Sequence, residues 1–289
     1  MNQAAATQSS QAAPQRFPTA IEVPLKFIRR QQGKPTFDSP ALAGGELKIF
    51  FGSESRTVPV ANMREIAGSF SLDREGFELL THQTAVQDLY DDEAIERTYL
   101  PETEALLAHR FGASKVVAFD ATRRSDSDAG AKNPDGNRGA VTLMHVDYTA
   151  KSGPERARDV LGEDEVARLT ATGARIVQVN VWRPIRGPVE RSHLALADVS
   201  SMESRDLIAT DQNYADRVGE IYMVAHAPSQ RWYYAPEMNR NEVLLFKGWD
   251  SLEDGRASFT PHGAFDPAEI REDAPPRESI EVRTFVVIE

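Results

Sequence analysis

The chain has 289 residues, a formal net charge of -11 and no cysteine. This length can bury a sizeable core, and all-β barrels of up to about 250 residues often form one domain. The acidic balance argues against a nucleic-acid or anionic-membrane surface, because such partners need clustered positive charge. The lack of cysteine excludes disulfides, thiolate nucleophiles and thiolate metal sites, so nitrogen and oxygen would have to hold any metal ion.

The first residues have the composition of a tail. Residues 1–18 are rich in Ala, Gln and Ser and poor in bulky apolar side chains, and we expect them to be disordered. They lack the charged start and apolar run of a secretory signal. No run of about 18 apolar residues occurs, so we expect no membrane-spanning helix. These features predict a cytoplasmic protein with a small-molecule partner, in which residues 19–289 form one domain.

Strands and one helix are expected in the first half of the chain. Apolar alternation over residues 46–51, followed by residues 57–60, predicts an antiparallel pair. From residue 93 the apolar spacing becomes helical until Gly112, where glycine offers a C-cap, and this helix is expected to cover one face of a sheet. Residues 115–119 predict a buried strand. Residues 124–139 predict a polar loop suited to a lid.

The second half of the chain predicts two short helices and several strands. The helices lie within residues 154–172 and separate near Gly162. The strongest strand pattern covers residues 175–183, and its alternation gives one face polar enough to line a cavity. Further strands are expected at residues 220–225, 231–234, 242–247 and 280–288. The pattern favours a mainly β fold with flanking helices, a cupin-like double-stranded β-helix or jelly roll.

A metal site is indicated by His145 and Asp147, which lie two residues apart in a segment that predicts a strand. Side chains at such positions project from one face, so both can bind one ion. His262 is the favoured third ligand, because it follows an apolar strand and precedes a strand that carries two arginines. Two histidines and a carboxylate are the ligand set of non-haem Fe(II) oxygenases, which leaves three coordination positions open.

Other readings of the histidines remain. His145 and Asp147 alone are also typical of a strand histidine beside a hydrogen-bonded carboxylate. His226 is an alternative third ligand, although no Arg-x-Ser strand follows it at a comparable interval, which favours a loop residue near a turn. His82 and His109 are expected to be structural or solvent-facing, and His193 to lie in a surface loop. The aromatic residues 232–234 and Trp182 are more typical of a core.

A carboxylate-binding strand is indicated fifteen residues after His262, at Arg277 and Ser279. A guanidinium grips a carboxylate with two parallel hydrogen bonds, and a hydroxyl can add a third. This is what the tail of 2-oxoglutarate needs. Arg283 shares the strand face of Arg277 and is a rival anchor, unless it pairs with nearby acids such as Glu278 and Glu281.

These residues lie in segments that resemble the AsaB-like hydroxylase/desaturase family, which includes relatives of the cephem methoxylase small subunit and the gibberellin desaturase. The resemblance covers the chain from about Gly76 to its C-terminus. It is carried by residues 145–149, 180–188, 231–234, 242–247 and 275–283. It implies a jelly-roll oxygenase that depends on Fe(II) and 2-oxoglutarate and often serves natural-product pathways.

The resemblance also implies roles for single residues. His145, Asp147 and His262 would bind the metal, and Arg277, with Ser279 or Arg283, would hold 2-oxoglutarate. Asn180 and Arg183 would lie near the pocket in cosubstrate or substrate roles. Apart from the resemblance, we also expect Trp182, Arg123 and Tyr148 at the pocket. The sequence departs from the family pattern at Ala121, where a histidine is expected, so a substrate contact from this position is not carried over.

The sequence therefore predicts an Fe(II)- and 2-oxoglutarate-dependent dioxygenase that uses O2 to attack an unactivated C–H bond of a small molecule. Hydroxylation, desaturation and oxidative cyclisation are all compatible outcomes. The alternatives are a cupin-like isomerase or hydrolase that does not use 2-oxoglutarate, and a non-catalytic accessory subunit of an oxidase. Arg183, Arg123 or Arg231 could meet a substrate carboxylate, which favours an amino acid or another small acid.

Overall fold

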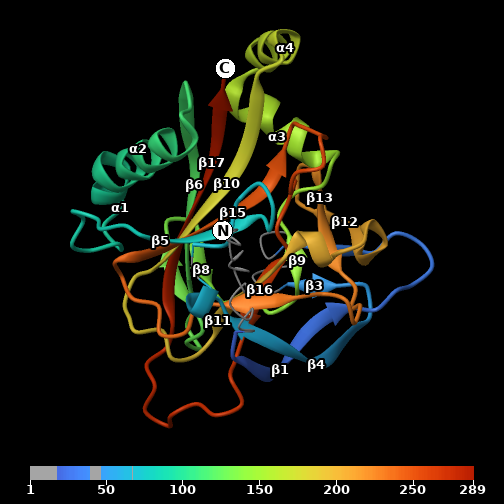
Figure 1. The fold of residues 1–289 in the computed structure, drawn as a ribbon, viewed down its shortest axis with the longest axis vertical. Coiled ribbons are helices and arrows are strands. Elements are labelled where there is room, and N and C mark those ends of the chain that lie inside the picture. The colour runs from blue at the N-terminus through green and yellow to red at the C-terminus, as the bar shows by residue number, and fades with distance from the viewer. Residues whose placement is uncertain (1–17, 40–46, 67) are drawn as a thin grey trace, which may run out of the picture.

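The structure, a computed structural model, describes residues 18–39, 47–66 and 68–289. The tail expected at residues 1–18 lies, apart from Pro18, outside the described residues. Within these ranges the chain is built mainly from strands that form two large sheets, with helices on the outside (Figure 1). No described helix is both long and apolar enough to cross a membrane. The jelly-roll fold predicted from the sequence is confirmed by this two-sheet architecture.

The larger sheet has ten strands in the described part of the chain, in the order β1-β4-β14-β11-β16-β9-β13-β12-β2-β3. Its strands are β1 (Ala20–Ile28), β2 (Thr36–Asp38), β3 (Lys48–Ile49), β4 (Ser53–Asn62), β9 (His145–Val146), β11 (His193–Ala197), β12 (Leu207–Asn213), β13 (Val218–Val224), β14 (Trp232–Tyr234) and β16 (His262–Phe265). The two short strands β9 and β16 are neighbours near its middle, which places His145 beside His262.

The smaller sheet has five described strands, all antiparallel to their neighbours, in the order β5-β15-β10-β17-β6. They are β5 (Phe77–Thr81), β6 (Lys115–Ser125), β10 (Arg175–Pro184), β15 (Glu242–Asp250) and β17 (Glu278–Ile288). Strand alternation splits β10 between two environments, as expected from the sequence. Val179 packs in the outer hydrophobic cluster, whereas Trp182 packs between the two sheets.

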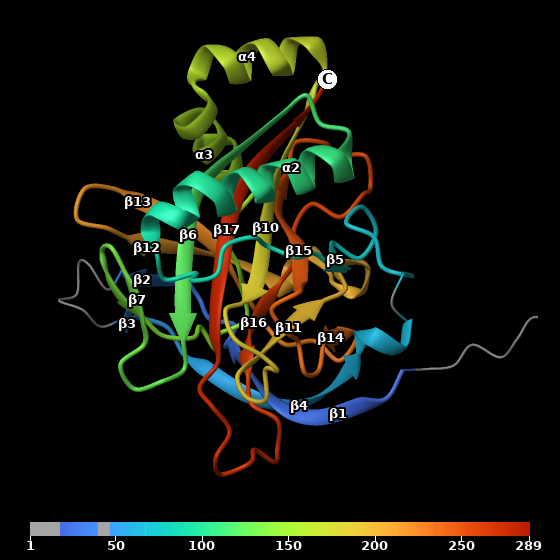
Figure 2. The same ribbon diagram turned by 90° about the vertical axis from the view of Figure 1, so that its left-hand side faces the viewer.

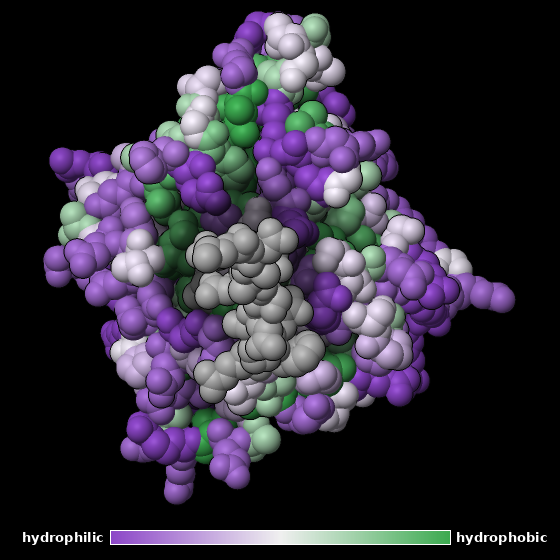
Figure 3. All heavy atoms as spheres, in the orientation of Figure 1, coloured by the Kyte–Doolittle hydropathy of each residue, from purple (hydrophilic) through white to green (hydrophobic). Residues whose placement is uncertain are grey.

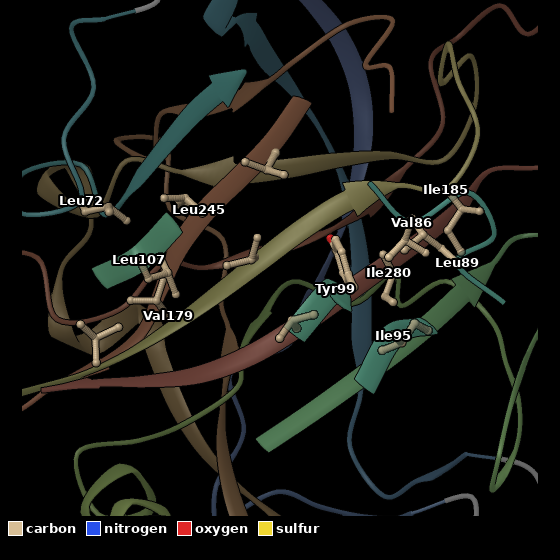
Figure 4. Packing of buried hydrophobic residues seen from close by; sticks show 14 of the residues in the cluster. Leu72, Val86, Leu89, Ile95, Tyr99, Leu107, Val179, Ile185, Leu245 and Ile280 are labelled. Carbon is tan, nitrogen blue, oxygen red and sulfur yellow. The ribbon is translucent and has the colours of Figure 1, made fainter. Parts of the chain in front are cut away.

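Helices cover the outer face of the smaller sheet. A continuous helical segment runs through α1 (Asp92–Ala94), a π-helical turn η2 (Ile95–Tyr99) and α2 (Leu100–Phe111), and Figure 2 shows α2 lying across β6 and β17. Ile95, Tyr99 and Leu107 pack against the valines of β10 and Ile280 of β17 (Figure 4). Gly112 ends α2 with a φ of 60°, so the expected helix, its C-cap and its place on the sheet are confirmed.

The remaining described elements are short. They are the helices α3 (Ser152–Leu161) and α4 (Glu163–Thr172), the 3-10 turns η1 (Met63–Ile66), η3 (Val199–Ser201) and η4 (Ser204–Asp206), and the hairpin strands β7 (Ala131–Asn133) and β8 (Gly136–Arg138). The two helices expected around Gly162 are thus confirmed. They pack against Trp249 and Phe285 at one end of the smaller sheet.

Three expected strands differ from the structure. The described residues 47–51 do not pair with residues 57–60, because β3 pairs with β2 while β4 pairs with β1. The partner β1 is distant in sequence, so local alternation could not specify this pairing. The strand expected at 115–119 continues to Ser125, and the expected loop 124–139 contains the β7–β8 hairpin.

The surface agrees with the acidic, polar composition. Mean hydropathy is -0.45, and hydrophilic side chains dominate the face shown in Figure 3, with hydrophobic ones between them. The buried apolar side chains fill two spaces, one between the two sheets and one between the smaller sheet and its covering helices. The ring of Phe246 on β15 lies 4.6 Å from that of His262 on β16, so the candidate metal ligands lie in the layer between the two sheets.

Candidate metal centre

Three side chains converge between the sheets. His145 and His262 are direct cross-strand partners in β9 and β16, and their ring centroids lie 4.4 Å apart. Asp147 Oδ1 lies 3.8 Å from His145 Nε2. One ligand atom from each of the three residues lies within 4.8 Å of the others. Strand β9 ends at Val146, one residue short of Asp147, but the convergence expected for the His145 and Asp147 side chains is present.

The backbone fixes the orientation of both imidazoles. His145 Nδ1 lies 2.8 Å from the carbonyl oxygen of Leu143, and His262 Nδ1 lies 3.0 Å from that of Thr260. A carbonyl oxygen can only accept, so each Nδ1 carries the proton and donates it. The Nε2 lone pairs are left free for a metal ion, as in metal sites where the other ring nitrogen is hydrogen-bonded.

The charge states suit a divalent cation. Burial, with repulsion from His262, lowers the pKa of His145 to about 4, and burial also lowers the pKa of His262. Burial raises the pKa of Asp147, but attraction to Arg283, to the two histidines when they are protonated, and the hydrogen bond from Asn180 outweigh it and hold that pKa far below its usual range. At neutral pH the site therefore offers two neutral imidazoles and one carboxylate, which fits the nitrogen and oxygen donors of Fe(II) sites.

A small pocket of about 30 Å³, partly open to solvent, lies beside these ligands. Both histidines line it, together with Trp182, Arg277 and Arg283. Two further charged residues line it that the sequence analysis missed, Arg124 on β6 and Glu281 on β17. Glu281 shares the strand face of Arg283, so alternation along the predicted strand 280–288 was a signal for it.

Arg277 is a buried cation with unused hydrogen-bonding capacity. Its side chain lies in the pocket wall, with the residue 4% exposed, and its guanidinium carbon lies 5.8 Å from the ring centroid of Trp182. Among the described residues, its Nε and Nη2 have no hydrogen-bond partner. Burial lowers its pKa to about 10, so it stays charged at neutral pH. Ser279 lies two residues on and is also buried. Such a cation is suited to receive a carboxylate.

Arg283 has a different environment, because acidic side chains surround it. Its Nη1 lies 2.6 Å from Asp120 Oδ2, its Nη2 2.5 Å from Glu281 Oε1 and its Nε 3.3 Å from Asp147 Oδ2. The pairing with Glu281 that the sequence left open is thus present, whereas Glu278 pairs with Arg186 instead. Arg283 balances the charge of a metal ligand and has less capacity for a cosubstrate than Arg277.

Comparison with known proteins places this chain in a family. A family model described as an oxidoreductase/YMDC permease-like domain matches residues 25–287. The chain is 31% identical over 265 residues to the α-ketoglutarate-dependent dioxygenase phiK of a fungal species, covering 88% of this chain and 92% of that protein. It is 32% identical over 254 residues to the hydroxylase/desaturase efuI of Hormonema carpetanum, covering 80% and 83%. The chain belongs to this family of Fe(II)- and 2-oxoglutarate-dependent dioxygenases.

Solved structures agree with this assignment. An iron and α-ketoglutarate-dependent endoperoxidase, NvfI, superposes with a TM-score of 0.81 at 26% identity, covering 93% of this chain and 98% of that one. The dioxygenase interpretation, its cofactors Fe(II), 2-oxoglutarate and O2, and the jelly roll are confirmed. They are favoured over a cupin-like isomerase or hydrolase and over an accessory subunit.

Two arginines expected in the pocket of this dioxygenase lie elsewhere. Arg183 donates to the Tyr99 hydroxyl and to the carbonyl oxygens of His82 and Arg240, on the helix-covered side of the smaller sheet. Arg123 pairs with Asp92 on the same side. The pocket positions expected for both are therefore wrong. Neighbouring strand residues point to opposite faces, so Trp182 and Arg124 face the pocket in their place.

The other expected pocket residues lie close to the triad. Asn180 Nδ2 donates to Asp147 Oδ2 at 2.7 Å. Tyr148 packs in the cluster around Trp249, and burial raises its pKa. Ala121 packs in the helix-side cluster, so the departure from the family pattern at this position does not alter the pocket.

The remaining histidines stay away from the triad. His226 packs against Phe27, with 5.3 Å between the ring centroids. His193 was expected in a surface loop, which is wrong, because it lies in β11 with 7% exposure and packs against Tyr234 and Phe265. The expectation that the aromatic residues 232–234 belong to a core is confirmed for Trp232 and Tyr234.

Proposed function

We propose that this dioxygenase holds Fe(II) with His145, Asp147 and His262 and a carboxylate of 2-oxoglutarate with Arg277. The supporting observation is the convergence of three ligand atoms within 4.8 Å beside a buried guanidinium with two unpartnered nitrogens among the described residues. When bound, the metal and cosubstrate supply an oxidant from O2, with succinate and CO2 as coproducts. The substrate is a small molecule that is attacked at an unactivated C–H bond.

The residues of the chain bind and orient 2-oxoglutarate and exclude water from it. Arg277 gives two parallel N–H donors to the carboxylate, and Ser279 adds a hydroxyl. The ring of Trp182 lies against the guanidinium and limits its contact with water. Hydroxylation, desaturation or cyclisation then depends on where the pocket holds the substrate carbon.

The substrate is proposed to be a small natural product, since relatives are named as a hydroxylase/desaturase and an endoperoxidase. The expectation that the substrate is a small acid depended on three arginines, and none of them lines the pocket. Arg183 and Arg123 face the helices, and Arg231 pairs with Asp198. Arg124 at the pocket wall is the cation best placed for a polar group of the substrate. The cytoplasmic location stays a prediction.

The test measures succinate formation that requires Fe(II), 2-oxoglutarate and O2. Ascorbate is added as the reductant that takes the place of the substrate, so 2-oxoglutarate can turn over before the substrate is known. We expect His145→Ala to abolish succinate formation and His109→Ala, an exposed residue of α2, to retain it. Calorimetry with 2-oxoglutarate in the absence of O2 separates this function from that of a metal enzyme that ignores the cosubstrate. Equal turnover in His145→Ala and the wild type would overturn the proposal.

A further inference from the structure

Asp147 is held by a side chain that is not itself a candidate metal ligand. Asn180 Nδ2 donates to Oδ2 of Asp147 at 2.7 Å, while Oδ1 faces His145 Nε2 at 3.8 Å. Arg283 reaches the two carboxylate oxygens only at 3.3 and 3.4 Å, which is long for a strong hydrogen bond. The short bond from Asn180 therefore fixes Oδ2 and leaves Oδ1 directed at the histidines.

Asn180 is in turn held by Gln178, two residues earlier on the same face of β10. Gln178 Nε2 donates to Asn180 Oδ1 at 2.6 Å, and both residues are fully buried. The charge of Asp147 sets the donor and acceptor direction of these two hydrogen bonds. An ionised carboxylate can only accept, so Asn180 must present its amide nitrogen to Asp147 and its oxygen to Gln178. Gln178 must then present its own nitrogen.

A backbone irregularity makes room for Gln178. In the β10–β15 pair, Gln178 lies opposite Trp249 and Val179 opposite Lys247, so Gly248 is the extra residue of a β-bulge. A Cβ atom on Gly248 would lie 1.7 Å from Gln178 Oε1. This oxygen has no hydrogen-bond partner among the described residues. The Gln178 amide is therefore positioned by its bond to Asn180 and by the space that glycine leaves.

We infer that Gln178 and Asn180 form a positioning relay that orients Asp147 for metal binding, and that the bulge at Gly248 is required for it. This inference rests on the proposed metal triad. It gives Asn180 a role towards a metal ligand, in place of the cosubstrate or substrate role expected from the sequence. Removing the outer partner of a metal ligand costs about 10–100-fold in metal affinity, which sets the expected effect.

The first experiment is a double-mutant cycle read by anaerobic calorimetry with Fe(II), with thermal unfolding as a check on folding. The variants are Asn180→Leu, Gln178→Met and the double variant, each close in size to the wild type. We expect Asn180→Leu to weaken Fe(II) binding by about 10–100-fold and Gln178→Met by less. A relay acts only through Asn180, so the double variant should bind like Asn180→Leu alone. Additive losses would overturn the relay.

The second experiment disturbs the relay from the backbone and needs no change to either amide. Gly248→Ala places a methyl group on Gln178 Oε1 and should weaken Fe(II) binding by several-fold to about tenfold. The matched control is Gly52→Ala, where the nearest atom to a new Cβ is a flexible Arg29 carbon at 3.4 Å. Equal affinity in Gly248→Ala and the wild type would contradict the inference. A wild type that binds no Fe(II) would instead overturn the proposed triad.

Discussion

His145 and His262 face each other as direct partners of the β9–β16 pair, with 4.4 Å between their ring centroids. Because both belong to strands of one sheet, their Nε2 atoms are set by the backbone register and by the bonds from Nδ1 to Leu143 and Thr260. Asp147 lies in a bend beyond β9 and has no such support. The histidines are thus the rigid part of the centre, and the carboxylate is the part that needs outside contacts.

The first prediction concerns the third ligand. His262→Ala should reduce Fe(II) affinity by more than the about 10–100-fold expected for loss of an outer partner, because a ligand itself is removed. Anaerobic calorimetry measures this. His226→Ala is the matched control, since His226 packs against Phe27 away from the triad and should leave the affinity unchanged. The reverse result would make His226 the ligand.

The second prediction separates cosubstrate binding from metal binding. Arg277→Gln should weaken 2-oxoglutarate binding by about 1.5–3 kcal/mol, the usual range for hydrogen bonds to a charged group, with little change in Fe(II) affinity. Arg283→Gln should weaken Fe(II) binding instead, because Arg283 lies against Asp147 and not against an open cation site. Binding of each ligand is measured separately by calorimetry. A larger 2-oxoglutarate defect in Arg283→Gln than in Arg277→Gln would exchange these roles.

The third prediction tests the structural role of Arg183. Its Nε donates to the Tyr99 hydroxyl at 2.9 Å, and both residues are fully buried. Tyr99→Phe leaves that donor without its partner, so the free energy of unfolding should fall by about 1–3 kcal/mol. Urea unfolding measures the loss, and the KM for 2-oxoglutarate should not change. A selective rise in KM at unchanged stability would favour the pocket role first expected for Arg183.

The sequence predicted the centre better than the contacts around it. Residue type and strand order along the chain were enough to predict that His145, Asp147 and His262 converge, because the chain has few histidines and no cysteine. The sequence itself contains a pattern that argues against a pocket position for Arg183. Alternation already placed Trp182 towards the cavity, so its neighbour had to face the helices. The family resemblance implies a pocket role for Arg183, which this local alternation contradicts.

Other errors depended on information that is not local. The choice between Arg123 and Arg124 requires the register of β6 against β17, which shifts between Arg283 and Thr284. The pairing of β1 with β4 joins distant segments, although Val23, Leu25 and Phe27 alternate as a buried strand face should. Bulges and long-range pairings are set by tertiary packing, which the hydrophobic pattern does not encode.

The last prediction concerns acid stability. Burial lowers the pKa of His193 to about 4, from a usual value of 6.5. The unfolded state therefore binds more protons between these values, so stability rises with pH across this window and is lost as the pH falls from 6.5 towards 4. At about 1.4 kcal/mol for each pKa unit, His193 alone accounts for up to about 3 kcal/mol.

His193→Phe removes this titration. The aromatic ring can keep its packing on Tyr234 and Phe265, and the lost Nδ1 has no hydrogen-bond partner among the described residues. Urea unfolding without metal measures the loss of stability between about pH 7 and about pH 4.5. This loss should be smaller in the variant than in the wild type, because the variant lacks the histidine whose protonation stabilises the unfolded state at low pH. His145 titrates in the same direction in both proteins, so it cancels in the comparison. An equal loss in both proteins would show that His193 is not the group whose burial opposes protonation.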